Sequence, residues 1–264
     1  MARVVNAGST VFDSSPASLF CTVARMPSIC SSVALRSLLS AAAAAMLGGG
    51  SLAQTVDDGG AWFGWFAQGK LGAADGSLAP LRWWLDVQDR LRDEGEQFDQ
   101  FLLRPGLGYA LTDRLTAWVG YAYIATDPVR RDEFGENRLW QQLTYNAPTD
   151  GFTLQGRARL EERFVETDGD TGYRLRVLAK AMVPMVADKS LFASVWDEAF
   201  WDLNDTDWGE RTGFRQNRAF AGLGLQLDDA PKVWIEVGYM NEWIDRRGPD
   251  KENHVLSISL FTVF

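Results

Sequence analysis

The sequence predicts an all-β fold: an antiparallel transmembrane β-barrel of the outer-membrane type, with about 10–12 strands. Three features of the sequence predict it: long segments of alternating apolar and polar residues, connections of two size classes, and an apolar leader near the N-terminus. Alternation with period two is typical of strands, because successive side chains point to opposite faces. A helix of the same sequence would scatter its apolar residues around its circumference.

The leader is an apolar stretch at residues 37–48, preceded by a basic residue and followed by a small-x-small sequence at 51–53. These three parts in this order are typical of a secretory signal. We therefore expect a signal peptide over residues 26–53, with residues 1–25 as an extension upstream of the true start. A buried alanine-rich helix is the alternative reading of the same stretch.

Removal of such a leader changes the composition. Both cysteines, Cys21 and Cys30, lie within residues 1–53, the extension and the signal peptide together, and loss of these residues takes the net charge from −9 to −11. An acidic chain is a poor partner for nucleic acid, whose phosphates attract basic surfaces. A single histidine is too few for a multi-histidine metal site, and the sequence indicates no cofactor.

Eleven segments of the chain alternate like strands. They are 61–71, 81–92, 98–111, 114–126, 136–145, 152–166, 172–184, 190–203, 214–227, 232–244 and 254–264. Bacterial single-chain barrels have even strand numbers, so we expect ten or twelve strands instead of eleven. Ten would follow if residues 54–79 were a lead-in strand or plug ahead of a barrel over 80–264, and twelve if one strand were missed.

Segment length and connection length separate a membrane barrel from a soluble β-sandwich, whose strands average about 5–6 residues. Most of the segments are nearly twice that length, as a membrane crossing requires. The short connections are 112–113, 146–151 and 228–231, and the longer charged ones are 127–135, 166–172, 204–213 and 245–253. Short turns on one side and long loops on the other fit a periplasmic and an outer face.

The C-terminal segment places Leu256, Ile258, Leu260, Thr262 and Phe264 on one face. This pattern resembles the terminal strand that the outer-membrane assembly machinery recognises. We therefore expect a monomer in the outer membrane of a Gram-negative bacterium. Its expected partners are membrane lipid, lipopolysaccharide and the barrel-assembly machinery, the last through the strand ending at Phe264.

Several short motifs carry a resemblance to a known family. They are Gly120-Tyr121, Glu136–Gln142, Arg157–Arg163, Arg174-Leu175-Arg176, Asn217-Arg218, Gly238-Tyr239 and His254-Val255-Leu256. With these motifs in this order, the chain resembles the proteobacterial domain-of-unknown-function family 2490 (DUF2490) over roughly residues 60–264. The resemblance implies an outer-membrane barrel without an established activity, and it provides no catalytic residues to transfer.

The inward face of the predicted strands is highly charged. Its basic residues are Arg82, Arg90, Arg92, Arg104, Arg138, Arg157, Arg159, Arg163, Arg174, Arg176, Lys180 and Arg218. Its acidic residues are Asp86, Glu136, Glu161, Glu198, Glu236 and Glu242. Charges inside a narrow barrel must pair or meet water, because an unpaired buried charge is costly. We expect a salt-bridged, essentially closed lumen, and a small anion-preferring pore is the alternative because rings of arginine favour anions.

Aromatic and glycine positions fit the same arrangement. Trp83 and Trp243 are expected in girdles at the membrane interfaces, whereas Trp84, Trp118 and Trp234 are expected inside the lumen. The glycine pairs Gly106/Gly108 and Gly222/Gly224 have no phosphate-loop context, and we interpret them as inward positions that make room for long side chains.

A lipid-modifying enzyme and a cation site remain weaker hypotheses. The only histidine, His254, has the outward parity, whereas Ser257 and Ser259 have the inward one, which disfavours a local catalytic dyad. Asp202, Asp205, Asp207 and Glu210 cluster in a long connection, but their spacing does not match a calcium-binding EF-hand. A solvated outer loop is the expected structure there. The sequence therefore predicts a structural or passive barrel and names no substrate.

Overall fold

A computed structural model of the chain describes residues 55–72, 76–129, 132–167 and 169–264. Eleven strands and one short 3-10 turn make up this part. The strands are β1 Thr55–Lys70, β2 Leu81–Arg92, β3 Gln97–Ala110, β4 Leu115–Thr126, β5 Phe134–Pro148, β6 Thr153–Val165, β7 Thr171–Pro184, β8 Leu191–Asp202, β9 Gly213–Asp229, β10 Lys232–Ile244 and β11 Asp250–Val263. The turn, η1, is Asp93–Gly95. The proposed signal peptide over 26–53 and the extension over 1–25 lie outside the described residues.

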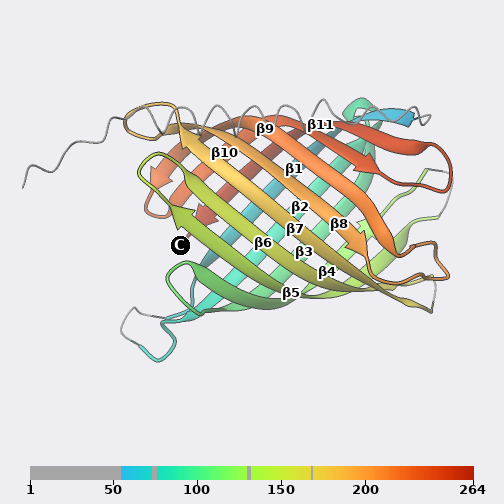
Figure 1. The fold of residues 1–264 in the computed structure, drawn as a ribbon, viewed down its shortest axis with the longest axis horizontal. Helices are drawn as coiled ribbons and strands as arrows, with labels where there is room; N and C mark the ends of the chain where they lie inside the picture. Colours follow the sequence, from blue (N-terminus) through green and yellow to red (C-terminus); the bar gives the residue numbers. More distant parts are fainter. Residues whose placement is uncertain (1–54, 73–75, 130–131, 168) are drawn as a thin grey trace, which may run out of the picture. The chain divides into compact units, whose positions relative to one another are not determined.

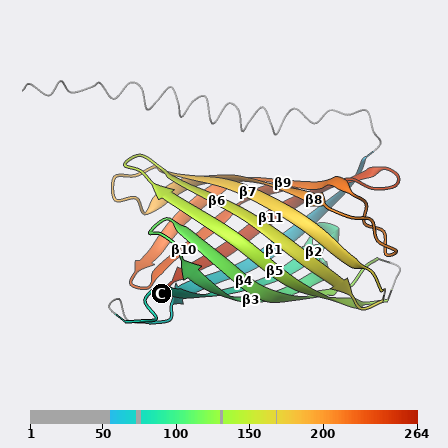
Figure 2. The ribbon, with the colours of Figure 1, turned by 60° about the horizontal axis from the view of Figure 1, so that its bottom comes forward.

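Each strand pairs with its neighbours in sequence, and the sheet closes into a barrel of tilted strands (Figures 1 and 2). All consecutive pairs are antiparallel. The all-β antiparallel barrel is therefore confirmed, and each expected segment corresponds to one strand. No helix within the described residues is long and apolar enough to cross a membrane.

The closure of the barrel corrects the expected strand count. The barrel has eleven strands, neither ten nor twelve, because β1 pairs in parallel with β11 from Thr55↔Asp250 to Gln68↔Val263. An odd count places the first and last strands side by side in the same direction. The wall thus begins at Thr55 and not at residue 80, and most of the segment 54–79 is a wall strand, not a plug.

The two ends of the barrel differ in their connections. At the end that carries Phe264, called here the C-terminal end, residues 111–114, 149–152, 185–190 and 230–231 make short turns. The opposite end, called here the loop end, carries 127–133, 166–170, 203–212 and 245–249. The two size classes overlap. The connection 71–80 at the C-terminal end is as long as 203–212 at the loop end, and 185–190 is longer than 166–170 and 245–249. The loop end also carries the short turn 93–96.

Side-chain alternation makes the barrel polar inside and apolar outside. Glu161 and Arg159 on β6 are completely buried, whereas Leu107 and Val119 on β3 and β4 are each 59% exposed. The expected faces are therefore confirmed on the central strands. Two lumen clusters supply the apolar packing, one around Trp118 and Trp140 and the other around Phe220.

Glycines at two positions allow the lumen to fill. A Cβ on Gly106 would lie 2.4 Å from Cη2 of Trp140, and a Cβ on Gly108 would lie 2.4 Å from Cε3 of Trp118. The expectation that these glycines make room for long side chains is confirmed, and the side chains are indoles. Trp84 packs edge-on against Trp118 at 5.5 Å, inside the lumen as expected.

Candidate functional site

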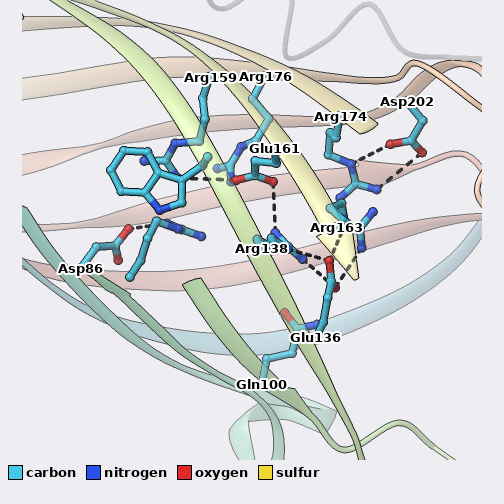
Figure 3. A network of polar contacts seen from close by, with 12 residues as sticks. Asp86, Gln100, Glu136, Arg138, Arg159, Glu161, Arg163, Arg174, Arg176 and Asp202 are labelled. Carbon is cyan, nitrogen blue, oxygen red and sulfur yellow. Dashed lines mark hydrogen bonds and ion pairs between the residues drawn. The ribbon is translucent and has the colours of Figure 1, made fainter. Parts of the chain in front are cut away.

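The lumen is the candidate functional site, because it gathers the buried charges of the described residues. At its centre is Glu161 on β6, which accepts hydrogen bonds from Nη1 of Arg176 at 2.7 Å and from Nη1 of Arg138 at 3.1 Å (Figure 3). A third guanidinium, that of Arg159, lies 3.6 Å away in an ion pair. One carboxylate thus bridges strands β5, β6 and β7.

Two further carboxylates extend this network around the wall. Glu136 on β5 binds Arg138 through Nε at 2.7 Å and Arg163 through Nε at 2.5 Å. Glu198 on β8 accepts from Nη2 of Arg157 at 2.7 Å and from Nε of Arg176 at 2.9 Å. Because Arg138 and Arg176 each bind two carboxylates, the ion pairs run without interruption from β5 to β8.

Smaller groups of ion pairs complete the lumen. Asp86 binds Arg104 between β2 and β3. Lys180 on β7 donates a hydrogen bond at 2.5 Å to Glu236 on β10. Glu236 also accepts a hydrogen bond from Oγ of Ser194 at 2.8 Å. Since β7 and β10 are not neighbours in the barrel, this contact crosses the lumen. Both residues also line a cavity of the lumen, described below.

Arginine–aromatic contacts involve a residue that the sequence analysis missed. The indole of Trp62 lies between the guanidiniums of Arg90 and Arg218, at 3.9 and 4.7 Å from the ring centroid. Arg218 also donates to Glu242 at 2.9 Å. Trp62 lies on β1, the segment expected to precede the barrel, although it shares an inward parity with Phe66 that could have revealed it.

The structure places thirteen of the fourteen predicted lumen residues in ion pairs. They are Asp86, Arg104, Glu136, Arg138, Arg157, Arg159, Glu161, Arg163, Arg174, Arg176, Glu198, Arg218 and Glu236. They form several separate groups. The exception is Arg82, whose Nη1 donates to the backbone carbonyls of Ala79 and Leu81 at the C-terminal end.

The acidic cluster after β8 differs in part from the expected solvated loop, because Asp205 and Asp207 are exposed as expected but the other two carboxylates are not. Asp202 and Glu210 turn inward: Asp202 accepts from Nε of Arg174 at 2.7 Å, and Glu210 accepts from Nη1 of Arg163 at 2.5 Å. Asp202 shares the inward parity of Glu198, a signal that could have placed it in the lumen. Among the described residues, no group of three or more His, Cys, Asp or Glu side chains is arranged to hold a metal ion.

Charge around Glu210 sets its ionisation. Burial favours the neutral carboxyl, but the positive charge of Arg174, together with Asp202 and Arg163, outweighs it, and the pKa of Glu210 falls well below its ordinary value. Glu210 is therefore ionised at neutral pH. Because it binds arginines of both β6 and β7, it ties the connection 203–212 to the mouth of the lumen.

Outside the lumen, His254 belongs to a different environment. Its Nδ1 lies 2.6 Å from the phenolic oxygen of Tyr239 on the outer wall. Ser257 is buried on the lumen side, so the two residues lie on opposite faces of β11. This arrangement offers no serine–histidine pair for nucleophilic catalysis.

Two cavities flank the central ion pairs. The cavity at the C-terminal end has a volume of about 500 Å³ and is bordered by Trp84, Arg104, Trp118 and Arg157. The cavity at the loop end has a volume of about 620 Å³ and is bordered by Arg163, Glu210 and other charged residues. Both fall within the range of small-molecule sites, about 300–1,000 Å³.

Known proteins give a family and no activity. The sequence matches the family described as "Protein of unknown function (DUF2490)" over residues 59–253. An uncharacterised protein of Methylorubrum extorquens is 34% identical over 189 residues, which cover 70% of this chain and 82% of that relative. No solved structure matches the chain.

Proposed function

Because this chain belongs to the DUF2490 family, whose function is unknown, we infer its role from its own structure. We propose that it is a monomeric outer-membrane β-barrel protein with a structural or passive role, its lumen closed by buried ion pairs. The observation that carries the proposal is the reversed polarity of the barrel, with arginines and carboxylates inside and large apolar side chains outside.

The outer wall supports membrane insertion. Toward the C-terminal end, the outward residues include Leu107, Val119, Leu143 and Leu225, which are between 44% and 59% exposed. Monomeric soluble proteins rarely expose contiguous apolar surfaces of more than a few hundred Å². A hydrocarbon layer around this part of the wall would bury these side chains, and the closed barrel leaves no unpaired strand edge.

Polar pairs on the same outer face mark one border of this apolar belt. Asp197 accepts from Nδ2 of Asn217 at 3.1 Å, and Tyr239 contacts His254, all within the halves of their strands nearer the loop end. Such groups favour a polar headgroup region over hydrocarbon. The loop end therefore faces outward from the cell in this proposal, where lipopolysaccharide surrounds the wall, and Phe264 faces the periplasm.

The central ion pairs support the passive role. An open pore needs a continuous aqueous path, whereas here Glu161, Glu136 and Glu198 are each bound by arginines from neighbouring strands and Lys180 reaches across to Glu236. Removing water from such charges is costly unless they remain paired. The resting lumen is therefore a cross-linked plug of side chains with a cavity on each side.

Fractionation and conductance together test this proposal. The protein should require detergent for extraction from the outer membrane and should migrate differently in gels before and after heating. In planar bilayers it should show no unitary currents over a range of salts and voltages. Release as a soluble periplasmic protein would refute the membrane assignment, and steady currents would refute the closed lumen.

A small anion-preferring channel is the second candidate, favoured by the excess of basic over acidic side chains around both cavities. In that case the bilayer currents would show a reversal potential displaced toward that of the anion. A lipid-modifying enzyme would be a third function. If the protein modified lipid and kept this activity after replacement of His254, the enzyme could not use a histidine-dependent mechanism.

The C-terminal strand provides the proposed contact with the barrel-assembly machinery. Phe264 is 59% exposed and its ring packs at 5.5 Å against Trp83 on the outer wall. Deleting Phe264 should lower the amount of heat-modifiable protein in the outer membrane while leaving synthesis and export unchanged. Undiminished assembly would argue against recognition through this residue.

A further inference from the structure

We propose that the cavity at the C-terminal end of the barrel binds a small organic anion with a flat apolar body, held by unpartnered N–H groups of Trp84, Arg104 and Arg157. This binding site goes beyond the proposed passive role, because ion pairs that close the lumen at mid-height still leave this cavity beneath them. The lining of the cavity continues to Asp113 and Arg114 in the turn between β3 and β4, at the end of the barrel.

The free hydrogen-bonding groups around this cavity are all donors. Nε of Arg104, Nε of Arg157 and Nε1 of Trp84 are buried and have no hydrogen-bond partner. Arg104 is only 2% exposed, so its Nε lies in a region where a missing acceptor is costly. No unpartnered buried acceptor is found among the described residues that line the cavity. A ligand that brings acceptors is therefore favoured over one that brings donors.

The charge around the cavity has the same preference. Eight lysine and arginine side chains line it against four aspartates and glutamates. Its buried carboxylates are already engaged: Asp86 by Arg104, Glu198 by Arg157 and Arg176. The remaining positive charge lies in surroundings from which water is partly excluded, where an anionic ligand is stabilised more strongly than in bulk water.

Aromatic rings form the other walls of the cavity. Trp196 stacks on Phe220 with ring centroids 5.2 Å apart, and Trp234 stacks on Phe261 at 4.9 Å. The indole N–H of Trp234 already donates to Glu236 at 2.9 Å, unlike that of Trp84. Flat aromatic faces favour offset or edge contacts with another flat ring. The ligand class is thus an aromatic or similarly flat carboxylate, sulfonate or phosphate.

The cavity at the loop end also has an excess of basic side chains, but it differs in its unpartnered atoms and therefore serves as an internal comparison. Its buried atoms without a hydrogen-bond partner include the acceptor Oδ1 of Asn253 as well as the donors Nε of Arg90 and Nε of Arg104, a residue that lines both cavities. Donors and acceptors of the protein are both left over there. The same anion should therefore bind at the C-terminal end and not at the loop end.

Fluorine NMR with three matched probes tests the site on the full chain in a neutral detergent. The probes are 4-(trifluoromethyl)benzoate, the corresponding benzyl alcohol and the corresponding benzylamine, which differ in charge but share a ring. We expect saturable broadening with the benzoate and at least tenfold weaker binding of the alcohol and the amine. The alcohol also reports unspecific partition into the micelle.

Three variants locate the bound anion. W84F keeps an aromatic ring but removes the free N–H, and R157Q removes one guanidinium while Glu198 keeps its contact with Arg176. We expect benzoate affinity to fall several-fold in W84F and about tenfold in R157Q. R246Q, at the cavity of the loop end, should bind benzoate like the unchanged protein. Heat-modifiable gel migration verifies that each variant is folded.

Each other outcome overturns the proposal. Equal binding of all three probes would make the cavity merely apolar, and absence of saturable benzoate binding would exclude the site for this ligand class. Benzoate binding that is unchanged in both W84F and R157Q would place the anion elsewhere. The binding test and the conductance test are independent of each other. Currents in a bilayer would refute the closed lumen, but they would not change the benzoate binding measured by NMR.

Discussion

Replacing Glu161 by glutamine tests whether the lumen ion pairs hold the barrel together. Glu161 is fully buried and accepts two charged hydrogen bonds, from Arg138 and Arg176, with Arg159 beside it. Glutamine keeps the size of the side chain, removes the negative charge and replaces one acceptor oxygen by an NH2 donor. Three arginines would then surround a neutral group.

The expected loss of stability follows from these contacts. Hydrogen bonds to charged groups contribute about 1.5–3 kcal/mol each, so two of them give about 3–6 kcal/mol. Arg138 retains Glu136 and Arg176 retains Glu198, which favours the lower end of this range. We expect E161Q to lower the free energy of unfolding by about 3 kcal/mol, as for other broken buried ion pairs.

The next residue on the same strand provides a matched control. Glu162 points outward and accepts one long hydrogen bond, at 3.5 Å, from Gln141. Urea unfolding of both variants in the same micelles, followed by tryptophan fluorescence and gel mobility, measures the difference. E162Q should remain within about 0.5 kcal/mol of the unchanged protein. Equal stability of E161Q and E162Q would refute the reasoning, since water would then solvate the lumen charges as well as their partners do.

Three further predictions follow from the packing, the loop and the topology. G120A should destabilise the barrel by about 1–3 kcal/mol in the same unfolding assay, because its Cβ would lie 2.2 Å from an indole carbon and 2.4 Å from a backbone carbonyl oxygen, whereas G156A, with nothing nearer than 4.0 Å, should be nearly neutral. Because the pKa of Glu210 is lowered in the folded protein, its ion pairs contribute fully to stability above the ordinary glutamate pKa. This contribution is lost as the pH falls through the lower pKa of the folded state. Hydrogen exchange of the connection after β8, corrected for intrinsic rates, should therefore stay constant from pH 7 to about 5 and rise only in stronger acid, and a rise near neutrality would contradict this. In whole cells an impermeant maleimide should label D57C at the loop end and not D113C at the C-terminal end; the reverse pattern would invert the proposed orientation.

Much of the wall could be predicted from the sequence. Period-two alternation assigns each side chain to a face from local information, because the pleat of a strand sends neighbours to opposite sides. Thirteen predicted lumen charges are accordingly paired, and Trp84 and Trp118 meet inside the lumen. Alternation also placed His254 and Ser257 on opposite faces of one strand, as the structure has them.

Local alternation fails where the strands are irregular. On β9 an extra residue, Arg215, interrupts the register with β8, and its Nε reaches Asp202 at 3.2 Å in spite of an outward parity. On β3 the register with β2 likewise skips Asp99. A bulge opposes two residues to one, so it changes the direction of a side chain without changing the sequence pattern around it.

By itself the sequence determined which segments are strands, which of their faces is charged and that the wall belongs to a barrel. Only the tertiary structure decided that Thr55–Lys70 closes the barrel in parallel with β11, which arginine binds which carboxylate, and which N–H groups of the lumen are left without an acceptor. The physical reason is that the side of the sheet to which a side chain points depends only on its position along its own strand. Closure and pairing depend on which distant strands meet, and backbone hydrogen bonds are chemically alike for every pair of strands.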